Sequence, residues 1–174
     1  MSHITLIRHG QANSTATDEA SYDRLSALGH QQAKWLGEHL IDTNQVHQNL
    51  FTGTLRRHAE TADGMATGIE PVRDERLNEL EYFTLATALE AEHGLAMPTQ
   101  QSEFVHHLPR VFEAWQANKI EGAPERFSEF ETRVNDVIKD IAARPGPTLV
   151  VTSGGLISMV MRQHLDLDII KMAN

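Results

Sequence analysis

The chain has 174 residues, of which 40% are hydrophobic and 22% charged, with a net charge of −9 at pH 7 and no cysteine. This length and balance predict a globular protein with a core of its own. The negative charge argues against nucleic acid or an anionic membrane as the main partner, and the lack of cysteine excludes disulfides and thiolate nucleophiles. No apolar run is long enough to cross a membrane and no leader follows Met1, so we expect a cytoplasmic protein.

The first predicted element is a buried strand in residues 3–8, "HITLIR", because four apolar or β-branched residues, 4–7, run directly into Arg8 and His9 before Gly10. The strand places Arg8 and His9 at its carboxyl end, where open α/β sheets bind their ligands. The polar stretch in residues 10–23 has the composition of a loop.

Two helices and two strands are predicted next. Ser26 is a favourable N-cap for a helix, and a strand in residues 49–52, "NLFT", leads through Gly53 into another. The core face of the first helix is expected to be Leu28, Gln32, Trp35, Leu36 and Leu40. The core face of the second is expected to be Leu55, Ala59, Ala62, Met65 and Ala66. Residues 70–74, "EPVRD", predict a weak third strand.

The second half of the chain is mostly helical in its pattern. Helices are expected at about residues 84–95 and 101–119, with Pro98 between them and Pro109 within the second. An amphipathic helix follows, with Phe127, Phe130, Val134, Ile138 and Ile141 on its apolar face. After "RPGP", the segment "TLVVT" predicts an apolar strand, "SGG" a tight turn and "LISMVMRQHL" a buried helix.

Strands that alternate with helices predict an α/β three-layer sandwich, with a mostly parallel central sheet and helices on both faces. Residues from about 80 to 125 carry no strand signal, and we expect them to form a helical cap insertion over the carboxyl edge of the sheet. We therefore predict one domain over residues 1–174.

Several residues could carry chemistry at this edge. Neutral imidazole is a competent nucleophile near pH 7, so His9 could attack a substrate whose anionic group is held by Arg8. A helix that starts at Arg56 offers free N–H groups to an anion, and Arg56 and Arg57 point about 100° apart, so one of them should reach the site. Arginines at a helix start also need a compensating anion, which a bound phosphate would provide.

A carboxylate and a turn complete the candidates. Glu79 or Glu81, in "RLNELEY", could protonate a leaving oxygen if its pKa were raised. The turn "VVTSGGL" offers an anion the Ser153 hydroxyl and the backbone N–H groups of Gly154 and Gly155.

Together, "LIRHG", "DRLSALGHQQA", "LRRHAETA", "LNE" and "VVTSGG" resemble the motifs of the histidine phosphatase superfamily, the phosphoglycerate-mutase-like proteins. The likeness runs from residue 4 to about residue 160 and implies an enzyme that transfers phosphoryl groups through a phosphohistidine. It implies that His9 is the nucleophile and that Arg8 and Arg57, rather than Arg56, hold the phosphate. Glu79 matches the acid–base carboxylate of the family.

The chain departs from the family in two places. Where Ser-His-Gly-Gly is usual, it has Thr152-Ser153-Gly154-Gly155, as in one branch that the chain resembles. Serine donates only a neutral hydrogen bond to phosphate, which should cost about 1–2 kcal/mol, or about 10-fold in rate. Ser153→His should then speed turnover. The final strand of the family is expected to be absent, because the sequence stops at "IIKMAN".

We therefore predict a phosphatase that hydrolyses phosphomonoesters without a metal or other cofactor. Its partner would be a small phosphorylated metabolite or a phosphopeptide, with no nucleic acid and no membrane. The cap would form the wall that faces the substrate, and His106, His107, Arg110 and Trp115 are its candidate contacts. The alternatives are a weak or inactive phospho-ligand or phosphoprotein binding module, and a phosphoglycerate-mutase-type phosphotransferase.

Two other readings are weaker. The pairs Glu90 with His93 and Glu103 with His106 have the spacing of di-iron bundles, but such a bundle would not contain "TLVVTSGG". A serine hydrolase built on Ser153 would lack the Gly-x-Ser-x-Gly frame and a partner histidine.

Overall fold

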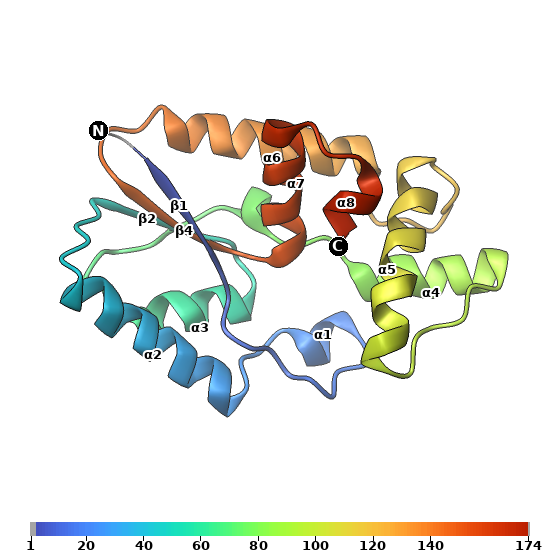
Figure 1. The fold of residues 1–174 in the computed structure, drawn as a ribbon, viewed down its shortest axis with the longest axis horizontal. Helices are drawn as coiled ribbons and strands as arrows, with labels where there is room; N and C mark the ends of the chain where they lie inside the picture. Colours follow the sequence, from blue (N-terminus) through green and yellow to red (C-terminus); the bar gives the residue numbers. More distant parts are fainter. Residues whose placement is uncertain (1–2, 174) are drawn as a thin grey trace.

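The computed structural model describes residues 3–173, in which strands and helices alternate along the chain (Figure 1). The strands are β1 Ile4–Arg8, β2 Asn49–Thr52, β3 Val72–Arg73 and β4 Thr148–Thr152. The helices of the first half are α1 Glu19–Tyr22, α2 Ala27–Asp42, α3 Arg56–Met65 and the 3-10 turn η1 Glu75–Leu77. Those of the second half are α4 Tyr82–His93, α5 Gln101–Gln116, α6 Phe127–Ala142, α7 Gly154–Leu165 and α8 Ile169–Ala173.

The described strands form one parallel sheet in the order β1-β4-β2-β3. The strand nearest the carboxyl terminus is thus central, with Val150 in register with Leu6 on one side and Phe51 on the other. All carboxyl ends lie at one edge of the sheet, because every pairing is parallel. The predicted α/β class with a parallel sheet is confirmed.

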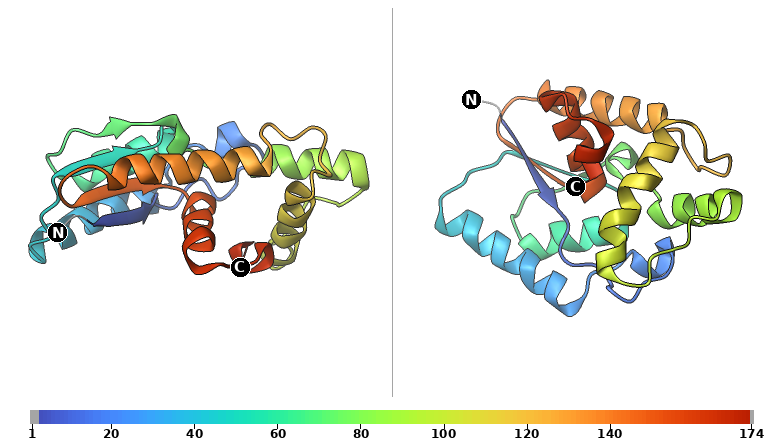
Figure 2. Two further views of the ribbon diagram at one scale, coloured as in Figure 1. Left: turned by 90° about the horizontal axis from the view of Figure 1, so that it is seen from above. Right: turned by 45° about the vertical axis from the view of Figure 1, so that its right-hand side comes forward.

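Helices cover both faces of the sheet, and β4 shows this most clearly. Val150 packs in a cluster with side chains of α6 and α7, whereas Leu149 and Val151 pack in a second cluster with side chains of α2 and α3. Successive side chains of a strand point to opposite faces, so the two clusters are the two sides of one sheet. Figures 1 and 2 show the corresponding layers, which confirm the predicted sandwich.

Helices α1, α4 and α5 lie beyond the carboxyl ends of the strands (Figure 1). Helix α4 contacts α1 and α5, and α5 also packs against α8 (Figure 2). Trp115 of α5 is only 1% exposed, and its indole N–H donates to the carbonyl oxygen of Glu125. Within residues 3–173, no helix is long and apolar enough to cross a membrane.

The predicted core face of α2 is wrong in part. Leu28 and Trp35 are 44% and 54% exposed, and the buried residues are instead Gly29, Ala33, Gly37 and Leu40. A Cβ on Gly37 would collide with the carbonyl oxygen of Met65 in α3. The two helices thus approach so closely that small residues form the contact, and the bulky residues of α2 lie beside it.

Two helices were not predicted. The polar stretch expected to be a loop contains α1, which Asp18 caps by accepting from the backbone N–H of Ser21 at 2.7 Å. A single turn of this kind depends on its cap rather than on an apolar pattern. Helix α8 follows α7 after a short connection and buries Met172 against the core.

Candidate active site

His9 lies directly after β1, where its backbone N–H donates to the carbonyl oxygen of Thr152 at 2.9 Å. Its imidazole is buried, and Nδ1 donates to the carbonyl oxygen of Gly10 at 2.7 Å. This bond fixes the ring proton on Nδ1 and leaves the lone pair on Nε2. Burial lowers the pKa of His9 to about 4, with smaller contributions from the charges of Arg57 and Arg8. The imidazole is therefore neutral at pH 7.

Gly10 allows the chain after β1 to pass close to α2. A Cβ on Gly10 would collide with the carbonyl oxygen of Gly29, near the start of that helix. The backbone N–H of Gly10 donates to Thr61 Oγ1 at 3.1 Å, and Thr61 lies on α3. Gly10 thus holds the end of β1 in contact with both α2 and α3.

Arg57 and Arg56 have different surroundings. Arg57 is 2% exposed, its guanidinium donates to Asp23 Oδ1 at 3.0 Å, and its Cζ lies 5.0 Å from the ring centroid of Tyr22. The buried Nε of Arg57 has no hydrogen-bond partner among residues 3–173. Arg56 points outward to Glu60 at 2.6 Å, with its side chain 67% exposed. Arg57 therefore retains an unused donor beside His9.

The anion at the start of α3 is a carboxylate of the protein. Asp23 accepts from the backbone N–H groups of Arg56 and Arg57 at 2.9 and 3.1 Å. Asn78 Oδ1 accepts from the two preceding N–H groups, those of Thr54 and Leu55. The expectation that a phosphate would compensate this helix start is wrong, because these acceptors already occupy it.

Arg8 ends β1 with an exposed side chain. It lies next to the turn between β4 and α7, because a Cβ on Gly154 would be 3.6 Å from Arg8 Nε, an ordinary contact. The structure thus brings Arg8, His9 and Gly154 together at the carboxyl edge of the sheet.

Glu79 lies on the other side of the same turn. Its carboxylate accepts from the backbone N–H of Gly155 at 2.9 Å and from that of Leu80 at 3.1 Å. Burial raises the pKa of Glu79, although these hydrogen bonds and the charges of Arg57 and Arg8 oppose the rise. A Cβ on Gly155 would collide with Glu79 Oε1, so this contact requires glycine. Glu81, by contrast, accepts from the Thr84 hydroxyl at 2.9 Å.

The segment that carries Glu79 is fixed from two sides. The Arg133 guanidinium of α6 donates to the carbonyl oxygens of Arg76 and Asn78 at 2.9 and 2.8 Å. The Thr152 hydroxyl of β4 donates to the carbonyl oxygen of Leu77 at 2.6 Å. Glu79 is thus positioned by its backbone, on a short segment between η1 and α4.

The site contains a histidine that the sequence analysis missed. His58 of α3 is fully buried, with Nε2 2.6 Å from Ser153 Oγ and its ring centroid 5.7 Å from that of His9. Burial, followed by the charge of Arg57, lowers the pKa of His58 to about 2. Its helical spacing from Ala62 and Met65, which are buried on the same face, was the signal that could have found it.

The predicted substrate contacts of α5 divide into three kinds. Trp115 is a core residue, so the prediction that it contacts a substrate is wrong. His107 is buried with Nδ1 2.9 Å from the Tyr82 hydroxyl, whereas His106 and Arg110 are exposed. Two aromatic rings outside α5 lie nearer to the site. The ring centroid of Tyr22 is 6.3 Å from that of His9, and the centroid of Phe83 is 5.9 Å from that of Tyr22.

The Glu-x-x-His pairs that were considered as metal ligands lie on α4 and α5, where His93, Glu90 and Glu103 form hydrogen bonds with nearby residues. His93 Nε2 lies 2.7 Å from the carbonyl oxygen of Lys119, and Glu90 accepts from the backbone N–H of Met97 at 3.3 Å. Glu103 accepts from Thr99 and Gln100 at the start of α5. In the described part of the chain, no group of three or more His, Cys, Asp or Glu side chains is arranged to hold a metal ion.

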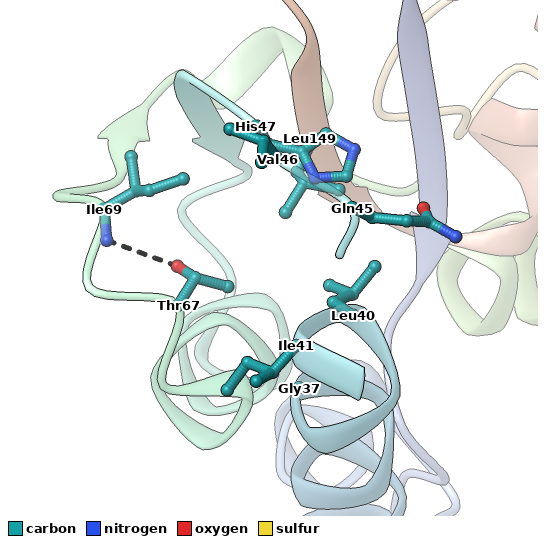
Figure 3. A pocket seen from close by; sticks show the side chains of 9 residues that line it. All are labelled: Gly37, Leu40, Ile41, Gln45, Val46, His47, Thr67, Ile69 and Leu149. Carbon is teal, nitrogen blue, oxygen red and sulfur yellow. Dashed lines mark hydrogen bonds between the residues drawn. The ribbon is translucent and has the colours of Figure 1, made fainter. Parts of the chain in front are cut away.

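A cavity of about 220 Å³ lies away from these residues (Figure 3). It is lined by Leu149, at the start of β4, by the segment before β2 and by Leu40 and Ile41 of α2. Thr67 accepts from the backbone N–H of Ile69 at its rim, at 3.3 Å. These residues lie toward the amino ends of the strands, opposite to His9.

Comparisons with known proteins identify a family and several structures with the same fold. The sequence model of the histidine phosphatase superfamily (branch 1) matches residues 4–174. A search of curated proteins gives no match. The similar solved structures include a mycobacterial glucosyl-3-phosphoglycerate phosphatase, with a TM-score of 0.64, 22% identity, and coverage of 97% of this chain and 81% of that one.

Two other similar structures extend the comparison. Phosphoglycerate mutase from Bacillus anthracis str. Sterne has a TM-score of 0.67 and 21% identity, over 92% of this chain and 78% of that one. A phosphoserine phosphatase mutant from Entamoeba histolytica, in complex with phosphoserine, has a TM-score of 0.67 and 16% identity. The likeness covers 99% of this chain and 84% of that one. At these identities the likeness shows a shared fold.

Proposed function

The chain belongs to the histidine phosphatase superfamily, and we propose that it is a phosphatase that hydrolyses phosphomonoesters through a phosphohistidine on His9. One observation carries the proposal. His9 is a buried, neutral imidazole whose proton is held by Gly10, so that Nε2 is free to attack, and the charges of Arg8 and Arg57 act on it. A nucleophile beside two guanidinium groups suits a substrate with a phosphoryl group.

The first step transfers the phosphoryl group to the enzyme. Nε2 of His9 attacks phosphorus in line with the ester oxygen, and the bond from phosphorus to that oxygen breaks. Glu79 gives its proton to the departing oxygen, for which its raised pKa is suitable. Arg8 and Arg57 stabilise the charge that spreads over the equatorial oxygens.

The second step releases phosphate. Water attacks phosphorus, the carboxylate of Glu79 takes the proton of the water, and the bond from phosphorus to Nε2 breaks. His9 returns to its neutral form and Glu79 to its protonated form, so the cycle closes without a cofactor. The same carboxyl group thus serves as acid and then as base.

The chemistry of the site and the similar structures support a substrate class. Two of those proteins are named as phosphatases, of glucosyl-3-phosphoglycerate and of phosphoserine, and both substrates are phosphomonoesters. We infer a small phosphorylated metabolite or a phosphopeptide for this chain. A module that only binds phosphate would have no use for a proton donor, so the raised pKa of Glu79 favours turnover.

A panel of phosphorylated metabolites and phosphopeptides, with nitrophenyl phosphate as a generic substrate, tests the proposal. Wild type should hydrolyse members of the panel and form a phosphohistidine that survives an alkaline quench. His9→Ala should abolish both, whereas His30→Ala, at a side chain 55% exposed, should change neither. Full activity in His9→Ala would overturn the assignment of the nucleophile. Phosphate binding without turnover in wild type would favour the binding module.

A further inference from the structure

His58 is fully buried in the site, yet none of the steps above uses it. Its Nε2 lies 2.6 Å from Oγ of Ser153, a residue 95 positions later in the chain. Space for the ring exists because residue 53 is glycine, since a Cβ on Gly53 would collide with Nδ1 of His58. A polar ring is costly to bury unless its hydrogen bonds are used, so a role in the site is expected.

The position of the ring proton follows from the surroundings of each nitrogen. His58 is neutral, with one ring proton, because burial and then the charge of Arg57 lower its pKa. The buried Nδ1 has no hydrogen-bond partner among the described residues. A buried N–H without an acceptor costs about 1–3 kcal/mol, and unpaired donors are rarer in proteins than under-used acceptors. The proton therefore belongs on Nε2, which donates to Ser153 Oγ.

This bond decides what Ser153 offers to an anion. A hydroxyl has one hydrogen to donate and two lone pairs to accept with. When one lone pair accepts from His58, the hydrogen of Ser153 remains for another acceptor. The ring of His58 connects this hydroxyl to the nucleophile, because Nε2 of His58 is 2.6 Å from Ser153 Oγ and the ring centroids of His58 and His9 are 5.7 Å apart. A phosphoryl oxygen at His9 can therefore be that acceptor. With the opposite tautomer, Ser153 would turn only lone pairs toward the anion.

We propose that His58 is a positioning residue that makes the Ser153 hydroxyl a hydrogen-bond donor to the phosphoryl group. The inference rests on the proposed function, because it requires a phosphoryl group beside His9. It means that α3 supplies the second imidazole of the site, whereas the turn after β4 supplies the hydroxyl that contacts the substrate.

A double-mutant cycle tests the coupling, with kcat/KM for nitrophenyl phosphate and the inhibition constant of inorganic phosphate as readouts. His58→Leu removes the donor at similar volume, and Ser153→Ala removes the hydroxyl. Each should lower kcat/KM about 10- to 100-fold and weaken phosphate inhibition. The double variant should be no worse than either single one, because both remove the same hydrogen bond. His58→Gln, whose amide N–H can reach the place of Nε2, should retain most of the activity.

The outcomes separate the two proposals. A wild type that neither hydrolyses nitrophenyl phosphate nor binds inorganic phosphate overturns the proposed function and this inference with it. An active wild type with an equally active His58→Leu, or with losses that add in the double variant, overturns the inference alone. Thermal melting checks that each variant is folded. If His58→Leu does not fold, Ser153→Ala still decides, since wild-type activity in that variant overturns the inference.

An exchange of the two side chains gives a second test. Ser153 Oγ lies only 2.6 Å from His58 Nε2, so the ring of Ser153→His would collide with that of His58. Contrary to the expectation from the sequence, this variant should lose activity rather than turn over faster. The double variant His58→Ser with Ser153→His restores the room and should be more active than Ser153→His. Faster turnover in Ser153→His than in wild type would overturn the inference.

Discussion

Arg57 differs from its neighbour Arg56 in what it can donate to a ligand. Because Arg57 is buried beside His9 with Nε unused, Arg57→Ala should remove a charge-assisted phosphate contact. A loss of about 2–4 kcal/mol in transition-state stabilisation is expected, which is roughly 30- to 1000-fold in kcat/KM. Arg56→Ala, which removes only an exposed pair with Glu60, should stay within about twofold.

A conservative variant separates charge from geometry at this position. Arg57→Lys keeps the positive charge but loses the planar fork of donors, so it should fall between Arg57→Ala and wild type. The inhibition constant of inorganic phosphate measures the ground-state part of the effect. Equal and small losses in Arg56→Ala and Arg57→Ala would show that neither arginine contacts the phosphate.

The dependence of activity on pH should report His9 and Glu79. The first step needs neutral His9, so kcat/KM should fall below about pH 4 as that ring takes up a proton. It also needs protonated Glu79, whose pKa burial raises, so kcat/KM should fall as the pH rises through this raised value. An optimum is expected between the pKa of His9 and the raised pKa of Glu79. Measurement of kcat/KM for an alkyl phosphate over a pH series, at constant ionic strength, gives both sides of this pH profile.

The nature of the leaving group provides the control for Glu79. Nitrophenolate leaves without protonation, whereas an alkoxide such as that of glycerol phosphate does not. Glu79→Gln should therefore cost about 100-fold or more with glycerol phosphate and much less with nitrophenyl phosphate. Equal losses with both substrates would show that Glu79 is not the proton donor in the first step.

At the scale of the element, α3 depends on a residue from another part of the chain. Leu55, its N-cap, has no side-chain hydrogen bond to the helix, and Asp23 caps the first turn instead. Asp23→Ala should lower the free energy of unfolding by about 1–2 kcal/mol. For a chain of this size each kcal/mol lowers the melting temperature by about 2–4 °C. Calorimetry or circular dichroism measures the shift.

Asp23→Asn is the matched variant for this prediction. Asparagine keeps an oxygen that can accept from the helix N–H groups but loses the charge that faces Arg57. It should melt closer to wild type than Asp23→Ala does. A melting temperature of Asp23→Ala equal to that of wild type would show that the cap adds nothing to stability.

The elements that the sequence predicted best are those with a strong local pattern. The segment "TLVVT" is a strand with the predicted bounds, and "HITLIR" contains the strand β1 Ile4–Arg8. All five residues of β4 are buried, as the apolar run of that segment predicts. The buried face of α2 was predicted wrongly. This face consists largely of the small residues Gly29, Ala33 and Gly37, which allow close approach of the backbones, and a pattern of hydrophobic residues does not indicate such a contact.

The site was harder to predict wherever two distant segments meet. The neighbours of His9 in sequence were identified at once, but the contact between His58 and Ser153 joins α3 to the turn after β4. From the sequence, a bound phosphate was expected at the start of α3. The anion there is Asp23, which the sequence did not indicate because it lies 33 residues before Arg56. Such pairs depend on the order of strands in the sheet, which alternation of strands and helices alone does not determine.

At the scale of the whole molecule, α4 continues the surroundings of His9 beyond the sheet. The backbone N–H of Phe83 donates to Glu19 of α1 at 2.8 Å, and the Phe83 ring adjoins Tyr22 beside His9. We expect residues from about 80 to 125 to determine which ester is accepted. Exchange of this segment with that of a relative should change the order of preferred substrates while His9 still becomes phosphorylated.

A point variant makes the same prediction without a chimera. Phe83→Ala should alter KM for bulky esters by about 10-fold, with less effect on small ones, because it removes an aromatic surface next to Tyr22. Phe104→Ala is the control, since Phe104 is 37% exposed and contacts Tyr82 rather than Tyr22. Unchanged preferences in both the chimera and Phe83→Ala would place the determinants of specificity elsewhere.

The central place of β4 has a consequence for how the protein folds as it is synthesised. Among the described strands, β1 pairs only with β4, and the two are separated by most of the chain. While the ribosome is still translating residues before Thr148, β1 has no partner, and the apolar faces of α2, α3 and α6 lack the strand on which they pack. Closing so long a loop is slow, and exposed apolar surface in a nascent chain invites aggregation. We therefore expect the nascent chain to aggregate most readily before residues 148–152 emerge, and the sheet and its carboxyl edge beside His9 to form together once they do.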